Sequence, residues 1–123
     1  MKVLVADDEI LVRYALKVIL AEAGHQVTEA ANGLQALQVL QDDPPDVLIL
    51  DLSMPVMSGY EVLRWLEEHS PARALSIIVV SGFVAEADAF DRHPLVTAVH
   101  QKPLIIDQLL DSLRECEDER IFA

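Results

Sequence analysis

Five polar side chains in this sequence could together bind a divalent cation and a phosphoryl group. They are three carboxylates, one hydroxyl and one ammonium, supplied by Asp7, Asp8, Asp51, Ser81 and Lys102. Carboxylate oxygens are ligands that Mg²⁺ prefers, and protein-bound Mg²⁺ often lies between one or two carboxylates and a phosphate. A hydroxyl and an ammonium can both donate hydrogen bonds to phosphoryl oxygens. These residue types therefore indicate phosphoryl chemistry, provided that the fold brings them together.

Each of these residues follows a short apolar run. The runs are 3–6 before Asp7 and Asp8, 47–50 before Asp51, 77–80 before Ser81, and 96–99, which ends three residues before Lys102. If the runs are parallel strands, their carboxyl ends meet along one edge of a sheet. In open α/β sheets that edge is where ligands bind, so the sequence predicts a single site there.

The predicted site has a consistent charge balance. Three carboxylates held close together repel one another, and a divalent cation relieves that repulsion. Lys102 can neutralise Asp51 in the empty site and hold a phosphoryl oxygen in the filled one. Asp51 is then available as a nucleophile, because carboxylates form acyl phosphates in such settings. Taken singly, Asp7 or Asp8 could instead cap the following helix, and Ser81 could belong to an ordinary turn.

The segments between the runs predict how the site is held. Strands are expected near 2–6, 27–30, 46–50, 76–80 and 96–100, because these segments are short and rich in Val, Ile and Leu. Helices are expected over 9–23, from Asn32 to about Gln41, from Ser58 to about Glu68, over 84–92, and from Pro103 as the first helical residue. This alternation predicts an α/β fold, a (βα)5 doubly wound parallel sheet with right-handed crossovers.

Composition limits the classes of function. At 123 residues with 52% hydrophobic residues, the chain has the size of one domain, residues 1–123, with its own core. The net charge of −12 disfavours direct contact with nucleic acid, and we expect neither a membrane span nor a signal peptide. The single cysteine, Cys116, excludes an internal disulfide and fits a reducing compartment, so we expect a cytoplasmic protein.

Four motifs together resemble the receiver domain of two-component response regulators, the family of the chemotaxis regulator (CheY-like). They are Val5-Ala6-Asp7-Asp8-Glu9, Asp51-Leu52-Ser53-Met54-Pro55 with Ser58-Gly59, Ser81-Gly82, and Lys102-Pro103. The resemblance covers essentially the whole chain. It implies a flavodoxin-like sheet of strand order 2-1-3-4-5. It also implies a phosphoacceptor switch in a two-component or phosphorelay system, with self-phosphorylation and slow autodephosphorylation but no other enzymatic activity.

The resemblance also implies a role for each site residue. Asp51 would accept a phosphoryl group from a phosphohistidine of a sensor histidine kinase or a histidine phosphotransfer protein. Ser81 would move toward that group and Lys102 would bind it. Mg²⁺ (or Mn²⁺) would be bound by Asp51, by Asp8 directly and by Asp7 mostly through water. The backbone carbonyl of Ser53 would be a further metal ligand.

Two departures from the family pattern concern signal transmission. Many members carry Tyr or Phe three residues before the lysine, where this chain has Val99, followed by His100. We therefore expect signalling through backbone and packing changes rather than through an aromatic rotamer, with His100 as an ordinary strand residue or a partial substitute. The segment 84–95 also lacks the common Gly-Ala step and contains Pro94, so its helix is expected to be short or loosely held.

The helix over 9–23 carries a second apolar stripe beyond its core face. We expect Leu11, Tyr14, Ala15 and Val18 to contribute to docking of a kinase, since the resemblance places the kinase contact on this helix. The alternative is a wide core stripe with a few exposed apolar residues.

Two other classes of function are open at this level. A pseudo-receiver would be a protein-interaction module that works without phosphorylation. A Mg²⁺-dependent phosphatase with an Asp nucleophile typically has a second Asp two residues later, where this chain has Ser53. Both a stand-alone regulator and a receiver within a longer regulator or hybrid kinase are compatible with the sequence, and the Met1 start slightly favours an N-terminal or independent receiver.

Overall fold

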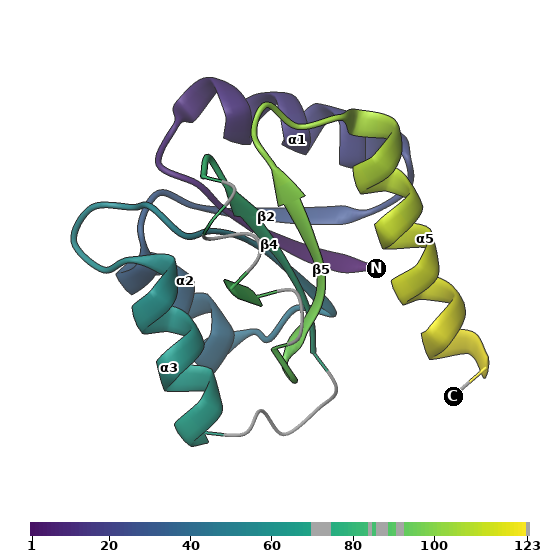
Figure 1. Cartoon of the computed structure of the whole chain (residues 1–123). Helices are drawn as coiled ribbons and strands as arrows, with labels where there is room; N and C mark the ends of the chain where they lie inside the picture. The colour runs from purple at the N-terminus through teal and green to yellow at the C-terminus, as the bar shows by residue number, and fades with distance from the viewer. Residues whose placement is uncertain (70–74, 84, 86–88, 91–92, 123) are drawn as a thin grey trace.

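The computed structural model describes residues 1–69, 75–83, 85, 89–90 and 93–122. Its strands are β1 (Lys2–Ala6), β2 (Gln26–Ala30), β3 (Val47–Asp51), β4 (Ser76–Ser81) and β5 (Val96–Gln101). The helices of the described residues are α1 (Ile10–Glu22), α2 (Gly33–Asp42), α3 (Gly59–His69) and α5 (Ile106–Phe122) (Figure 1). The helix predicted over 84–92 falls largely on residues outside this description.

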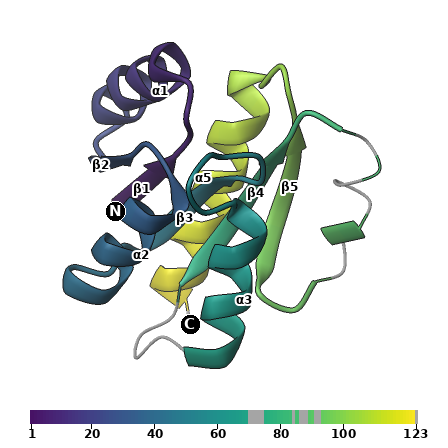
Figure 2. The same cartoon turned by 90° about the vertical axis from the view of Figure 1, so that its left-hand side faces the viewer.

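The five strands form one parallel sheet of order β2-β1-β3-β4-β5, which confirms the predicted fold class and strand order. Figure 2 shows β2 and β5 at opposite edges of this sheet. In the register, Ala6 pairs with Leu50, Asp51 with Val80, and Ser81 with Gln101. The carboxyl ends of β1, β3, β4 and β5 are therefore level, as the predicted site requires.

Two apolar clusters cover the two faces of the sheet. One packs the sheet against α2 and α3, and the other packs it against α1 and α5 (Figure 1). Within β1, Leu4 belongs to the first cluster while Val3 and Val5 belong to the second. Successive strand side chains point to opposite faces, so a strand that is covered on both must be apolar throughout. This explains the continuous apolar runs of the central strands.

Helices α2 and α3 each start with a capping box, at the predicted first residues Asn32 and Ser58. The Gln35 N–H donates to Asn32 Oδ1 at 2.9 Å, and Gln35 Oε1 accepts from the Ala31 N–H. At α3, the Glu61 N–H donates to Ser58 Oγ at 3.3 Å while the Ser58 N–H donates to Glu61 Oε2 at 2.8 Å. These reciprocal bonds satisfy backbone groups that a helix start leaves unpaired.

Gly59 holds the start of α3 close to the end of β3. A Cβ atom at this position would overlap the Asp51 carbonyl and lie 2.7 Å from Leu52 Cα, so only glycine allows this approach. The Gly59 N–H donates to the Leu52 carbonyl at 3.0 Å. The loop that follows Asp51 is thus fixed against the sheet rather than free to leave it.

The prediction that Pro103 is the first residue of the last helix is wrong, because α5 begins at Ile106. The Lys102 N–H still donates to the Ser81 carbonyl at 2.7 Å, which keeps Lys102 beside β4. The residues after Lys102 turn the chain from the edge of the sheet onto the face of the sheet, where Leu104 packs against the core. Among the described residues, none of the helices has the length and apolar composition needed to cross a membrane.

Candidate functional site

Three carboxylates meet at the carboxyl edge of the sheet. Asp7, Asp8 and Asp51 each offer an oxygen within 4.8 Å of the other two. Asp7 directly follows β1 and Asp51 is the last residue of β3, so neighbouring strands position both side chains. Asp7 and Asp51 are only 3% and 4% exposed, whereas Asp8 is exposed. Water can therefore solvate little of the charge on Asp7 and Asp51.

The Asp7 carboxylate is oriented by the turn that starts α1. Its Oδ1 accepts the Glu9 N–H at 2.8 Å, and the Arg13 guanidinium donates to the Asp7 carbonyl at 2.8 Å. The residue that caps α1 is Glu9, whose own side chain makes no capping hydrogen bond. Asp7 thus contributes to the start of the helix through Oδ1, while its Oδ2 lies 3.1 Å from Lys102 Nζ.

Asp51 has an environment that disfavours its charge. Burial raises the pKa of Asp51 to about 6. The hydrogen bond from the Ser53 N–H and the positive charge of Lys102 act to lower this pKa, whereas the negative charge of Asp7 acts to raise it. The Ser53 N–H donates to Asp51 Oδ1 at 3.1 Å, and Oδ2 lies 3.3 Å from Lys102 Nζ. The carboxylate is therefore held in one orientation by two donors.

Lys102 lies between the carboxylates at the end of β5. Its Nζ is 3.1 Å from Asp7 Oδ2, 3.1 Å from Glu9 Oε1 and 3.3 Å from Asp51 Oδ2. Burial alone would lower the pKa of Lys102, but the hydrogen bonds to Asp7 and Glu9 outweigh it and raise that pKa above its usual range. Lys102 therefore stays charged and partly neutralises the cluster. Glu9 was not among the predicted site residues, although it follows the acidic pair directly.

Ser81 ends β4 beside Asp51 but its hydroxyl is engaged locally. Ser81 is 1% exposed, and its Oγ both donates to the Phe83 carbonyl and accepts the Phe83 N–H, each at 3.1 Å. The residue is therefore at the predicted place, but its donor must turn away from Phe83 to reach a phosphoryl group. Ser53 follows Asp51 closely, and its carbonyl stays a predicted metal ligand.

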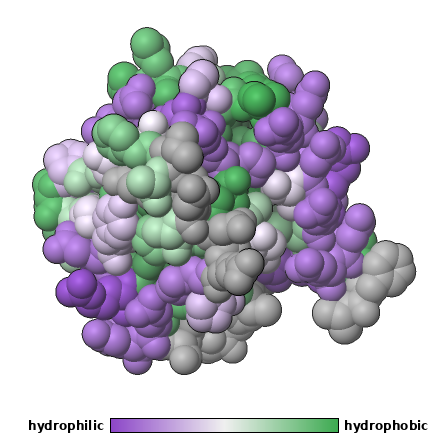
Figure 3. Space-filling view, viewed as in Figure 1, coloured by the Kyte–Doolittle hydropathy of each residue, from purple (hydrophilic) through white to green (hydrophobic). Residues whose placement is uncertain are grey.

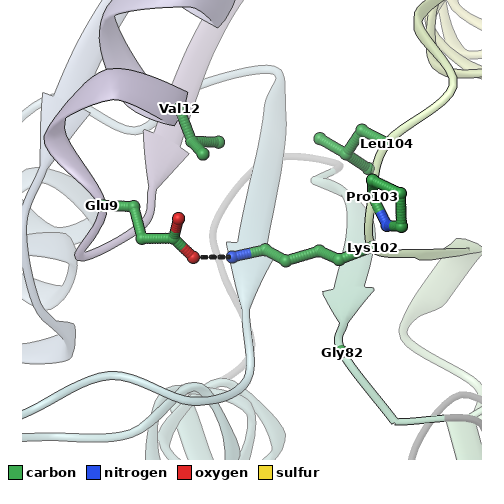
Figure 4. A pocket seen from close by; sticks show the side chains of 6 residues that line it. All are labelled: Glu9, Val12, Gly82, Lys102, Pro103 and Leu104. Atoms are coloured by element: carbon green, nitrogen blue, oxygen red, sulfur yellow. Dashed lines mark hydrogen bonds and ion pairs between the residues drawn. The ribbon is translucent and has the colours of Figure 1, made fainter.

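A cavity of about 440 Å³ opens beside Lys102. Its lining, drawn in Figure 4, consists of Glu9, Val12, Gly82, Lys102, Pro103 and Leu104. The figure shows Glu9 and Lys102 reaching toward each other from the start of α1 and the end of β5. Apart from this pair, the lining side chains are apolar. A small molecule or a partner side chain could reach the Lys102 ammonium through this space.

The outer surface of α1 is apolar and exposed. Leu11, Tyr14 and Val18 are 80%, 64% and 40% exposed, and Ala15 is exposed as well. Figure 3 shows hydrophobic surface over α1 at the top of the molecule. The predicted second stripe is therefore not part of the core, and its role in docking stays a prediction.

The two residues that depart from the family pattern point to different faces of the sheet. Val99 is half-buried and packs against the cluster under α2 and α3. His100 faces α5, where its Nε2 lies 2.8 Å from Ser112 Oγ, and burial lowers the pKa of its imidazole. His100 thus links β5, which ends near Lys102, to the last helix.

Comparisons with known proteins agree with this fold. The family model for the response regulator receiver domain matches residues 3–114, a range that contains every site residue named above. Sporulation initiation phosphotransferase F of Bacillus subtilis is 29% identical over 116 residues, which cover 93% of this chain and 91% of that protein. The transcriptional regulatory protein KdpE of Mycobacterium tuberculosis is 39% identical over 116 residues, 91% of this chain and 49% of that protein.

A solved structure extends the comparison to the fold in detail. The response regulator protein TrrA of Thermotoga maritima, in complex with Mg²⁺ and BeF, is 26% identical with a TM-score of 0.78. The match covers 94% of this chain and 97% of that one. The fold is thus that of a known response regulator.

Proposed function

Because this chain belongs to the response regulator receiver domain family, a family of phosphoacceptor signalling switches rather than classical enzymes, we propose that Asp51 is its phosphoacceptor. The observation that carries the proposal is the position of the Asp51 carboxylate. It is buried, within 4.8 Å of two other carboxylates and 3.3 Å from an ammonium. A group so placed can bind phosphoryl oxygens and cation ligands at once. We further propose that residues 1–123 act as one receiver domain.

Receiver domains interact with histidine kinases or phosphotransfer proteins, and the donor proposed here is a phosphohistidine of such a partner. One oxygen of Asp51 attacks the phosphorus atom, and a P–O bond forms as the P–N bond breaks. The electron pair of the broken bond stays on the imidazole nitrogen, and the product is an aspartyl phosphate. Phosphoryl transfer needs mainly in-line positioning and neutralisation of charge, which Lys102 can supply from 3.3 Å.

The donor set fits a hard divalent cation. Asp7, Asp8 and Asp51 offer only carboxylate oxygens, which suit Mg²⁺ or Mn²⁺, and the Ser53 carbonyl would add another oxygen ligand. When bound, the cation would neutralise charge on the carboxylates and on the phosphoryl oxygens. The family binds Mg²⁺ at such a site, and the TrrA structure contains Mg²⁺ with BeF.

Ser81 and Lys102 are proposed to hold the phosphoryl oxygens after transfer. Lys102 is already next to Asp51, so it needs little movement. Ser81 must exchange its hydrogen bond to the Phe83 carbonyl for one to the phosphoryl group. That exchange would change the loop after β4 and is one way in which phosphorylation reaches the surface.

The partner surface is proposed to be the exposed apolar face of α1. Leu11, Tyr14, Ala15 and Val18 form this face, and α1 begins directly after the acidic pair. A helix that docks here would bring its histidine toward the carboxyl edge of the sheet. The exposure and the apolar character of this face support docking to another helix.

Mass measurement with a small donor tests the acceptor. The protein is incubated with Mg²⁺ and acetyl phosphate, and its intact mass is followed over time. We expect the gain of one phosphoryl group in the wild type and none in Asp51→Asn. No gain in the wild type would contradict the proposal and favour a pseudo-receiver. Sustained release of phosphate from many phosphate esters would instead favour a phosphatase.

A further inference from the structure

We propose that Glu9 is a specificity-determining residue of this site, which slows phosphorylation by small anionic donors. Glu9 would hold one N–H donor of Lys102 until a phosphoryl oxygen replaces it. The inference rests on the proposed role of Asp51 as the phosphoacceptor. It follows from the hydrogen bonds, the exposure and the position of Glu9.

The Lys102 ammonium has all its donors engaged. An ammonium carries three N–H groups. Three carboxylate oxygens lie within 3.3 Å of Nζ, one each from Asp7, Glu9 and Asp51. A phosphoryl group on Asp51 brings new oxygens to this nitrogen. One of the present acceptors must therefore give way before Lys102 can bind the phosphoryl group.

Glu9 is the acceptor that can leave most easily. The side chains of Asp7 and Asp51 are each 5% exposed, whereas that of Glu9 is 60% exposed. A carboxylate released into water is hydrated at once, and exposed ion pairs are weak. Asp7 is also fixed by the Glu9 N–H, and Asp51 carries the phosphoryl group itself. Glu9 is thus the ligand that Lys102 exchanges.

The position of Glu9 adds an electrostatic effect on approaching donors. Glu9 and Lys102 face each other in the cavity beside the site, with Val12, Pro103 and Leu104 as apolar walls (Figure 4). A small donor that enters here meets the Glu9 carboxylate next to its target ammonium. Like charges repel, and the 60% exposure of the Glu9 side chain keeps this repulsion modest. A dianionic donor is affected more than a monoanionic one.

The Glu9 carboxylate does not stabilise the start of α1. Glu9 is the N-cap residue of α1, but its side chain makes no capping hydrogen bond. The bond that supports the helix start comes from its backbone N–H to Asp7 Oδ1 at 2.8 Å. Glu9→Gln keeps that backbone bond and the side-chain length while removing the charge. The variant should therefore fold as the wild type does.

Initial rates of phosphorylation test the inference. Intact mass is followed with acetyl phosphate, a dianionic donor, and with phosphoramidate, which carries less negative charge. We expect Glu9→Gln to be phosphorylated about two- to fivefold faster by acetyl phosphate, the range that an exposed ion pair supports. The gain should be smaller with phosphoramidate, and it should shrink at high salt. Glu9→Ala, which also removes the acceptor, should gain at least as much.

The matched control is Glu22→Gln. Glu22 is exposed at the other end of α1, about 20 Å along the helix from Glu9, so the net charge changes equally. Its rate should equal that of the wild type. The role of Glu9 would be overturned if Glu22→Gln increased the phosphorylation rate as much as Glu9→Gln does. It would also be overturned if the rate were unchanged or lower in both Glu9 variants. A wild type that gains no phosphoryl group at Asp51 would instead overturn the proposed function.

Discussion

At the scale of single residues, Asp51 combines a costly charge with a chemical need for that charge. Its carboxylate is 4% exposed, next to the Asp7 carboxylate, and its pKa is raised to about 6. A protonated carboxyl group is a poor nucleophile, so the proposed chemistry requires the ionised form. Above about pH 6 the Asp51 carboxylate is therefore ionised in the folded protein, although its surroundings destabilise that charge. Groups of this kind are concentrated at functional sites.

The first consequence is a pH-dependent effect of Asp51→Asn on stability. The pKa of Asp51 rises from 3.8 to about 6 on folding, so the native state binds more protons between these values and loses stability as pH rises. Above pH 6 the ionised group costs up to about 3 kcal/mol of unfolding free energy. Asp51→Asn should therefore be more stable than the wild type at pH 8, in urea unfolding without divalent cations.

The same comparison at pH 3.5 is the internal control. There Asp51 is protonated in the folded state and mostly protonated in the unfolded state, so the advantage of Asp51→Asn should nearly disappear. Asp118→Asn removes an exposed carboxylate on α5 and should change stability little at either pH. A wild type as stable as Asp51→Asn at pH 8 would show that Lys102 and Ser53 compensate the buried charge fully.

At the scale of elements, α1 has two separate tasks. Its inner face buries Leu16 and Leu20 against the sheet, while its outer face leaves Leu11 80% exposed. Such large exposed apolar side chains in one stripe are typical of an interaction surface. Because the two faces do not share residues, the outer one can be changed without loss of the fold. Docking and phosphoryl chemistry can therefore be tested independently.

Leu11→Glu combined with Val18→Glu should separate docking from chemistry. Placing charges in a docking surface costs several kcal/mol when the residues are anchors, so phosphotransfer from the cognate kinase should fall about tenfold or more in kcat/KM. Phosphorylation by acetyl phosphate needs no docking and should stay unchanged. Ile121→Glu, at an apolar residue 69% exposed near the end of α5, is the matched control. Undiminished transfer from the kinase, with the fold intact, would refute docking on α1.

Most elements and the positions of the site residues were predictable from the sequence, for a physical reason. The central strands are covered on both faces, so their apolar runs are continuous, and their ends place Asp7, Asp51 and Ser81 together. The start of α5 was not predictable in the same way. The turn after β5 depends on the tertiary bond from the Lys102 N–H to the Ser81 carbonyl, which no local pattern contains.

The contacts of Glu9 and of the Ser81 hydroxyl are not contained in any local sequence pattern. Glu9 follows the acidic pair, but its contact with Lys102 joins residues that are 93 positions apart. The Ser81 hydroxyl bonds to Phe83 in this structure, and only a three-dimensional arrangement reveals that engagement. The types and the order of the residues thus predict which groups meet, whereas the hydrogen bonds among these groups depend on the three-dimensional structure.

At the scale of the whole molecule, the proposed cation site would couple metal binding to global stability. Its proposed carboxylate ligands lie at the ends of β1 and β3, so they come together only when the sheet is formed. A ligand that binds only the folded state raises the free energy of unfolding. At ten times its Kd, Mg²⁺ should therefore add about 1.4 kcal/mol at neutral pH, measured by urea unfolding.

The net charge of −12 decides how this last measurement must be controlled. Any salt screens the self-repulsion of so acidic a chain and stabilises it without a specific site. Wild type in NaCl of equal ionic strength therefore supplies the baseline. Asp8→Asn removes one exposed ligand of the cluster, and its response to Mg²⁺ should fall to that baseline. If Mg²⁺ raised the free energy of unfolding of the wild type no more than NaCl does, this would argue against a cation site at this edge. If Mg²⁺ stabilised Asp8→Asn as much as the wild type, Asp8 would not be a ligand.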